Sequence, residues 1–349
     1  MVFKTKTGIP EAAVGVTFRQ YLEYVGLRVA GWIVCLLPYR WLIWISRPLG
    51  SIVYHLDLRG KAIAMENLTA VFGETMDDPE KRRTAEAGYR SFARTMLELF
   101  WSPNVTPAFA AKTFRTQGLP GAPVGTPCIY VTIHYSNFEW LGLNAALFLG
   151  PGIVVAQKLK NPLLGAHFSR LRSSTGHASI PQHRSIARML AHLRSGGYFC
   201  ALVDLNLDPG EASVIIDQFG GLKTCVTQIH TALALHTGAR IVPAECRPLP
   251  DGTYEMHYYK ALEYARDASP QSIAQQCWDV LEPNVRSNPA HWLWSYKHWR
   301  FKPSGDPSVR YPAYANHARR FDRAIAKQDV VPNPAGAGAK NGVVGNGSR

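Results

Sequence analysis

The sequence is poor in acidic residues relative to basic ones. It has 25 Asp and Glu residues against 38 Lys and Arg residues, which gives a formal net charge of +13 at pH 7. This balance favours an anionic partner: a nucleic acid, an anionic membrane surface, or an acidic protein or substrate. With nine Trp and 46% hydrophobic residues, the chain suits a membrane surface better than nucleic acid. We therefore expect no nucleic-acid partner.

Familiar motifs for nucleotides, metals and nucleophilic hydrolysis are also missing. There is no GxxxxGKS/T phosphate loop, no HExxH and no GxSxG. The six cysteines are scattered without CxxC or zinc-finger spacing, which indicates buried, reduced thiols in a cytosol-facing domain. His291 and His298 have no carboxylate or Cys at ligand spacing. We expect neither a metal site nor a bound cofactor.

The most apolar region, residues 21–56, is interrupted by Arg40 and by Arg47 and Pro48. A spanning helix needs about 20 consecutive apolar residues, and shorter runs are more often interfacial, re-entrant or buried. The tryptophans and arginines of this region suit the headgroup boundary. We interpret residues 1–56 as a lead and a retained helical membrane anchor, either interfacial or a tilted single pass. The alternative is a pair of helices that covers a soluble core.

Residues 57–104 have helical spacing, with a second helix that starts at Asp77 or Asp78, and residues 103–127 form a Pro- and Gly-rich linker. Strand-like and helix-like segments then alternate. The predicted strands are 128–133, 153–157, 198–203, 240–245 and 254–259, and the predicted helices are 138–149, 161–174, 183–196, 226–237 and 270–286. The alternation indicates an α/β fold, a mostly parallel sheet flanked by helices. Ligands of such sheets bind beyond the carboxyl ends of the strands.

The C-terminal third mixes aromatic and basic residues. Residues 287–302 alone could be a nucleic-acid stacking platform, an interfacial helix or a core-packing helix. We favour core packing for Trp292 and Leu293. We expect the basic side chains of this segment to face an anion: Lys297, Arg300 and Lys302. We interpret residues 303–349 as an extension with a short basic helix over 312–327 and disorder after 330.

His134 lies where a predicted strand ends and an apolar helix begins, and Glu139 follows five residues later. On a continuous helix these side chains would point about 140° apart, so they meet only if His134 lies in the turn. A histidine held by a carboxylate beside a helix N-terminus can act as a general base. The alternative is a capped helix with a buried histidine. Asp204 follows another strand, and the sheet could bring it to the same edge.

Six blocks of the sequence occur in the order typical of one family. His134 to Glu139 correspond to an HxxxxD/E motif, usually written H-x-G-N-W-E, in which Asn137 agrees whereas Ser136 and Phe138 depart. The other blocks are Arg59, Asn67, Leu68 and Phe72; Asn161, Pro162, Arg170 and Arg172; Val203, Asp204 and Leu205, without the usual glutamine; Gln218, Phe219 and Gly220; and Asn288, Pro289, His291, Trp292, Leu293, Trp294, Lys297, Trp299 and Arg300. Over roughly residues 20–302 the chain resembles the late lipid A (lauroyl and myristoyl) acyltransferases and the related phosphatidylinositol mannoside acyltransferases. We take residues 57–302 as the acyltransferase domain.

The resemblance implies transfer of an acyl group from a thioester, on acyl carrier protein or acyl-CoA, to a hydroxyl of an anionic lipid A precursor. His134 would be the base and Glu139 would hold its tautomer. Backbone N–H groups near Asn137 and the guanidinium of Arg172, with Arg170 as second choice, would stabilise the oxyanion, or the arginines would grip an acceptor phosphate. Asp204 would support His134, shape the site or serve only as a cap.

No nucleophilic Ser or Cys has an adjacent base, so we expect direct transfer, with the acyl thioester as a co-substrate. The resemblance places the protein in lipopolysaccharide biosynthesis at the cell inner membrane, with its catalytic domain facing the cytoplasm. Other acceptors are a lysophospholipid or a phosphatidylinositol-mannoside-type glycolipid. The non-enzymatic alternative is a basic membrane-surface binding protein. Contact between His134 and Glu139 beside a cavity would favour the enzyme, and its absence would weaken that interpretation.

Overall fold

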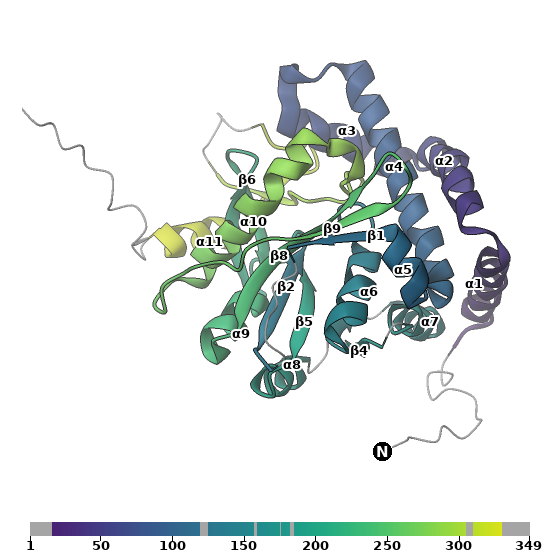
Figure 1. Ribbon diagram of the computed structural model, residues 1–349. Helices are drawn as coiled ribbons and strands as arrows, with labels where there is room; N and C mark the ends of the chain where they lie inside the picture. Colours follow the sequence, from purple (N-terminus) through teal and green to yellow (C-terminus); the bar gives the residue numbers. More distant parts are fainter. Residues whose placement is uncertain are drawn as a thin grey trace, which may run out of the picture.

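The computed structural model describes residues 16–118, 125–156, 159–174, 176–181, 185–304 and 310–329. A seven-stranded sheet forms its centre, with the strand order β1-β9-β8-β2-β5-β3-β4 (Figure 1). The strands of this sheet are β1 Phe114–Gln117, β2 Cys128–Thr132, β3 Ile153–Ala156, β4 Ala178–Pro181, β5 Tyr198–Leu202, β8 Arg240–Pro248 and β9 Tyr254–Tyr258. All neighbouring strands run parallel except β8 and β9. The predicted α/β class with a mostly parallel sheet is confirmed.

The helices surround this sheet. They are α1 Phe18–Leu36, α2 Tyr39–Leu56, α3 Leu58–Phe72, α4 Asp78–Trp101, α5 Pro107–Thr113, α6 Phe138–Leu149, α7 Pro162–Arg172, α8 Ser185–Arg194, α9 Ile229–Thr237, α10 Pro270–Ser287 and α11 Arg319–Asp329. Capping residues fix their starts: the carboxylate of Asp77 accepts the backbone N–H of Glu80 at 2.6 Å before α4. The predicted bounds of α6 agree with the structure.

Alternate residues of the central strand β2 face two separate cores, as the two-residue period of a strand requires. Ile129 and Val131 join the larger core, which includes residues of α3, α8, α9 and α10. Cys128 and Tyr130 face a second, aromatic core with residues of α5 and α6. Because both faces are covered, β2 is buried at every position. The strand can therefore hold the residues after its carboxyl end in a fixed place.

Several short elements were not predicted. The segment interpreted as a linker contains α5 and the edge strand β1, although its residues 119–124 lie outside the described residues. Strand β4 was also missed, and α9 begins three residues later than predicted because Thr227 ends a hairpin. This hairpin, β6 Ser213–Gln218 and β7 Leu222–Thr227, pairs antiparallel as a separate two-stranded sheet. Strands of four to six residues give too few repeats for a clear periodic signal.

The aromatic and basic segment after α10 is not an α-helix. It forms a short 3-10 helix, Pro289–His291, followed by turns. Trp292 is fully buried, so its predicted core packing is confirmed. Arg300 donates to the side-chain and backbone oxygens of Asn206, both at 2.9 Å, and the anion expected beside this segment stays a prediction. The segment thus ties the C-terminal part of the chain to the loop that follows β5.

The C-terminal extension packs on the body of the protein over its described part. Phe321 of α11 is fully buried against Ile215 and Cys225 of the β6–β7 hairpin. A second short pairing joins Phe301–Lys302 to Asn316–His317. The predicted basic helix exists but starts later, at Arg319. The disorder predicted after residue 330 lies outside the described residues.

Helices α1 and α2 lie along one side of the molecule, next to α4 (Figure 1). Most of the large apolar side chains that are exposed belong to this segment: Phe18, Tyr21, Leu22, Val25, Val29, Trp32, Ile33, Leu36, Trp41, Trp44, Ile45, Leu49, Ile52, Val53, Leu56 and Leu58. We call this set the α1–α2 apolar face. Within the described residues, no helix combines the length and the apolarity that crossing a membrane requires. The helical part of the predicted anchor is therefore confirmed, whereas its membrane role stays a prediction.

A glycine lets α2 approach α4 closely. A Cβ atom on Gly50 would meet the backbone of Tyr89 and Arg90, which cannot move without shifting α4. Gly26 of α1, in contrast, has nothing within 4 Å of an added Cβ. The contact at Gly50 thus fixes α2 against the rest of the fold.

We predict that Gly50→Ala destabilises the protein by about 1–3 kcal/mol through overpacking. The matched change Gly26→Ala should instead stabilise it by up to about 1 kcal/mol, because alanine is the better helix former. Denaturant unfolding followed by circular dichroism measures both changes. Equal effects of the two substitutions would contradict a tight α2–α4 contact.

Candidate active site

The turn after β2 carries the predicted histidine and is fixed from several sides. Ser136 has a φ of +50°, a conformation that favours glycine, and glycine is the residue at this place in the family pattern described above. Its carbonyl oxygen accepts the hydroxyl of Thr95 at 2.9 Å, and its N–H donates to the carbonyl of His291 at 2.8 Å. Asn137 then caps α6, because its side-chain oxygen accepts the N–H of Trp140 at 2.8 Å. His134 is therefore held in a rigid turn.

The imidazole of His134 is hydrogen-bonded to Asp204. Nδ1 of His134 lies 2.8 Å from Oδ1 of Asp204, and the backbone N–H of His134 donates to Oδ2 at 3.0 Å. The contact follows from topology, because β2 and β5 are parallel neighbours with Thr132 opposite Leu202. Residues that follow the two strands therefore meet at one edge of the sheet. Of the roles left open for Asp204, support of His134 fits this geometry.

Asp204 is fully buried and ionised. Burial alone would raise the pKa of this carboxyl, but the adjacent His134 outweighs it and lowers the pKa to about 2. Since an ionised carboxylate only accepts hydrogen bonds, Nδ1 of His134 carries the proton in this contact. In the neutral form of the imidazole Nε2 therefore has the free lone pair, and within the described residues nothing hydrogen-bonds to it. This is the tautomer that a general base needs.

Glu139 does not hydrogen-bond to His134, which corrects our expectation. Its carboxylate binds Arg172 of α7 instead: Nε of Arg172 lies 2.9 Å from Oε2, and Nη2 lies 2.6 Å from Oε1. No hydrogen bond or ion pair joins His134 and Glu139 in the part of the chain that the structure describes. The physical reason is that the ring of His134 is held by the residue after β5, whereas Glu139 faces α7. The expected carboxylate contact exists, but Asp204 makes it.

The other predicted site residues, Asn137, Arg170 and Arg172, have different surroundings in the structure. The side chain of Asn137 is occupied at both ends, by Trp140 and by Oε2 of Glu98 at 2.6 Å, and its backbone lies against the thiol of Cys246. The side chain of Asn137 thus serves the fold of the turn, whereas the role of the backbone N–H groups near it as oxyanion donors stays a prediction. Arg170 is exposed on α7 and makes no described contact with the other site residues. Arg172 is joined to the start of α6 through Glu139.

Sequence reasoning missed the buried carboxylate of Glu98 on α4. This side chain is fully buried and accepts hydrogen bonds from four groups on four segments: Arg94 at 2.8 Å, Tyr39 at 2.9 Å, Asn137 at 2.6 Å and Tyr254 at 2.6 Å. The feature of the sequence that could have identified it is a single acidic residue within the apolar run Met96–Phe100. Since buried carboxylates persist only when they are paired, Glu98 joins α2, α4, β9 and the His134 turn.

An apolar cavity of about 390 Å³ lies between α2, α4 and the segment after α10. It is lined by Leu49, Val53, Asp57, Ala85, Gly88, Tyr89, Phe92, Ala93, Met96, Leu97, Phe100, Trp292, Leu293, Trp294 and Ser295. Leu49, Val53 and Phe92 are also exposed at the surface, so the cavity opens beside the α1–α2 apolar face. His134 does not line it. Trp292 does, and the indole N–H of Trp292 donates to Oδ2 of Asp204 at 3.0 Å.

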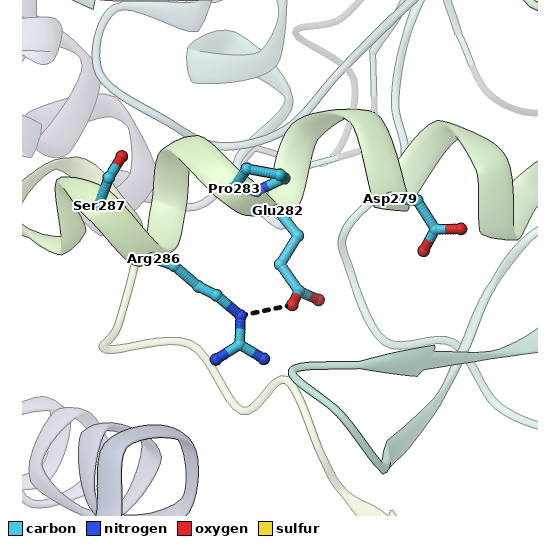
Figure 2. A pocket seen from close by; sticks show the side chains of 5 residues that line it. All are labelled: Asp279, Glu282, Pro283, Arg286 and Ser287. Carbon is cyan, nitrogen blue, oxygen red and sulfur yellow. Dashed lines mark hydrogen bonds and ion pairs between the residues drawn. The ribbon is translucent and has the colours of Figure 1, made fainter. Parts of the chain in front are cut away.

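A second hollow, of about 500 Å³, lies on the outer side of α10 (Figure 2). The charges in it serve the fold: Glu282 accepts Nε of Arg286 at 2.7 Å and the backbone N–H of Phe219 at 2.6 Å. Phe219 has a φ of +48°, so this carboxylate secures the β6–β7 turn. Among the described residues, no group of three or more His, Cys, Asp or Glu side chains is arranged to hold a metal ion. The His134–Asp204 pair is therefore the better candidate for chemistry.

A histidine held by a buried carboxylate at the carboxyl edge of a parallel sheet, with an apolar cavity nearby, is an arrangement typical of enzymes that act on substrates with an apolar part. Residues 16–301 match the family described as bacterial lipid A biosynthesis acyltransferase, and the chain belongs to this family. It is thus an acyltransferase that acts on lipid. The resemblance found in the sequence is confirmed.

Two further similarities accompany the family match. The chain is 25% identical over 302 residues to the lipid A biosynthesis lauroyltransferase of Escherichia coli (strain K12), which covers 83% of this chain and 95% of that protein. Among solved structures it is similar to the 1-acyl-sn-glycerophosphate (LPA) acyltransferase PlsC from Thermotoga maritima, with a TM-score of 0.34 and 13% identity over 72% of this chain and 99% of that one.

We predict that Glu98→Ala destabilises the protein by about 3–5 kcal/mol, because it leaves a buried arginine without its partner. The control is Glu86→Ala on the same helix. Glu86 pairs with Arg90 four residues later, 2.6 Å apart, but both side chains are partly exposed. Loss of this ion pair should lower the free energy of unfolding by about 1 kcal/mol or less. Chemical denaturation measures both, and similar costs would show that Glu98 does not organise the turn.

Proposed function

We propose that this enzyme transfers a fatty acyl group from a thioester, on acyl carrier protein or coenzyme A, to a hydroxyl group of a lipid A precursor. The observation that carries the proposal is the His134–Asp204 pair, which leaves Nε2 of the imidazole as the free base. An alcohol is a poor nucleophile at neutral pH and needs such a base within hydrogen-bond reach. The family and the E. coli relative support a lipid acceptor in lipid A biosynthesis.

The proposed reaction has two steps. Nε2 of His134 takes the proton of the acceptor hydroxyl while its oxygen attacks the thioester carbonyl carbon, which gives a tetrahedral oxyanion. The C–S bond then breaks, the acyl group stays on the acceptor oxygen, and the imidazolium returns its proton to the leaving thiolate. Asp204 stabilises the imidazolium between the two steps, and its low pKa keeps it ionised. No acyl-enzyme is formed.

Arg172 supplies the positive charge in this proposal. Glu139 holds two of its nitrogens, Nε and Nη2, so the guanidinium has one orientation, whereas Nη1 makes no hydrogen bond within the described residues. Burial tends to lower the pKa of Arg172, but the contact with Glu139 raises it overall. The fixed cation can face the oxyanion or a phosphate of the acceptor. Glu139 therefore orients Arg172 and does not act on His134.

We also propose that α1 and α2 lie in the cytoplasmic interface of the inner membrane. The α1–α2 apolar face contains three exposed tryptophans, Trp32, Trp41 and Trp44, which suit the headgroup boundary. The basic balance of the chain attracts it to anionic lipid. Because the cavity opens beside this face, a hydrocarbon chain of the lipid acceptor can enter it from the bilayer without crossing water.

We predict that His134→Ala lowers transfer at least 1,000-fold, in the range expected for loss of a general base (about 10²–10⁴), and leaves the fold intact. His317→Ala, which removes an exposed histidine from the C-terminal extension, is the control and should be fully active. The measurement is mass spectrometry of the acylated product with purified enzyme. Retained turnover in His134→Ala would remove the proposed base.

The same assay tests the acceptor. A lipid A precursor and a lysophospholipid are each supplied with acyl carrier protein and with coenzyme A as thioester donors. Acylation of the lipid A precursor supports the proposal. Acylation of the lysophospholipid alone would assign the enzyme to glycerolipid metabolism. Absence of transfer to both acceptors would favour the remaining alternative, a phosphatidylinositol-mannoside-type glycolipid.

For the membrane surface we predict that Ile52→Asp weakens binding to anionic vesicles at least tenfold, because it removes about 2 kcal/mol of apolar burial and adds repulsion. Ile186→Asp is the matched control on α8, since the two side chains are 55% and 52% exposed. Vesicle flotation measures both variants. Equal binding would exclude the α1–α2 apolar face as the membrane contact.

A further inference from the structure

We infer that Trp292 is a positioning residue for the base, because its indole N–H fixes the carboxylate of Asp204 in the orientation that binds His134. This inference rests on the proposed function, in which His134 is the base. Trp292 is far from His134 in the sequence and does not touch the ring nitrogens. It acts only through Asp204, to which it donates at 3.0 Å.

The two carboxylate oxygens of Asp204 have different partners. Oδ1 receives Nδ1–H of His134 at 2.8 Å, whereas Oδ2 accepts the backbone N–H of His134 and the indole N–H of Trp292, each at 3.0 Å. Because Asp204 is fully buried, water cannot replace a lost donor. Without the indole N–H, Oδ2 keeps only one donor, and the carboxylate can rotate about its Cβ–Cγ bond. The direction of the contact with His134 is then no longer fixed.

Trp292 itself has little freedom to move. Its ring stacks on His298 with centroids 4.0 Å apart and 20° between the planes, and meets Trp294 edge-on at 4.8 Å. Its backbone pairs with Tyr135, the residue next to His134. The donor and the base are thus fixed to the same turn. The same tryptophan also lines the apolar cavity, so a test must separate the two contacts.

The ionisable groups around Asp204 are His134 before α6, and His298 and Tyr296 in the segment after α10. Burial lowers the pKa of His298 to about 4, so this ring is neutral near pH 7. It does not compete with His134 for the charge of Asp204. Removing the indole N–H leaves more negative charge on the carboxylate, which favours the protonated form of its histidine partner. The acidic limb of the pH–rate profile should therefore move to higher pH.

The test uses Trp292→Phe and, as an isosteric variant that keeps the ring packing, benzothienylalanine at position 292, in which sulfur replaces the N–H. Two controls isolate the contact. Trp299→Phe removes a buried indole whose N–H has no partner among the described residues. Trp294→Phe changes another tryptophan that lines the cavity but donates to the carbonyl of Pro289.

We expect both variants at position 292 to lower kcat about tenfold, which corresponds to about 1.4 kcal/mol, and to shift the acidic limb upward. The two controls should keep the wild-type pH profile, and the isosteric variant should keep the KM for the acyl donor. An isosteric variant with wild-type kcat and pH profile would overturn the inference, even if Trp292→Phe fails to fold. If His134→Ala is inactive in that case, the proposed function stands and only the role of Trp292 is lost.

Discussion

The hydrogen bond between His134 and Asp204 depends on two strands that lie side by side and in register. The two residues are 70 positions apart in the sequence. The parallel pairing of β2 and β5 ends both strands at one edge, and the residue after each strand turns toward the same space. Two further features support this contact. The turn at Ser136 aims the imidazole, and the buried surroundings of Asp204 keep its charge directed at one partner.

Buried and half-buried carboxylates organise this basic protein well beyond its candidate active site. Glu98 joins the α2–α4 pair to the His134 turn, and Glu282 secures the β6–β7 turn. A third, Glu245 of β8, accepts hydrogen bonds from Tyr259 at 2.7 Å and from Asn284 of α10 at 2.9 Å, and pairs with Arg247. Because a buried anion must find donors, each one selects a single arrangement of the segments around it. The few acids of the chain therefore have a large share in specifying the fold.

The sequence predicted the elements whose signal is local. Helix α6 could be placed to the residue because Asn137 is a good cap and ten of the twelve positions that follow are apolar or small, and His134 stood out before its start. Glu139 was assigned to His134 because sequence spacing measures only how far apart two residues can be, not where their side chains point. Its true partner, Arg172, depends on how α7 packs against α6. Trp292 and Glu98 were equally out of reach, because their contacts join segments more than thirty residues apart.

The glycine at position 50 has a consequence for how the enzyme sits at its substrate. With no side chain between them, α2 and α4 pack as one solid unit, and α4 supports the catalytic turn through Thr95 and Glu98. Over the described residues there is no hinge between the helix proposed to touch lipid and the base. In the proposed membrane orientation, the depth of α2 in the bilayer sets the height of the imidazole above the lipid surface. An enzyme arranged in this way would select among hydroxyl groups by how far each one projects from that surface.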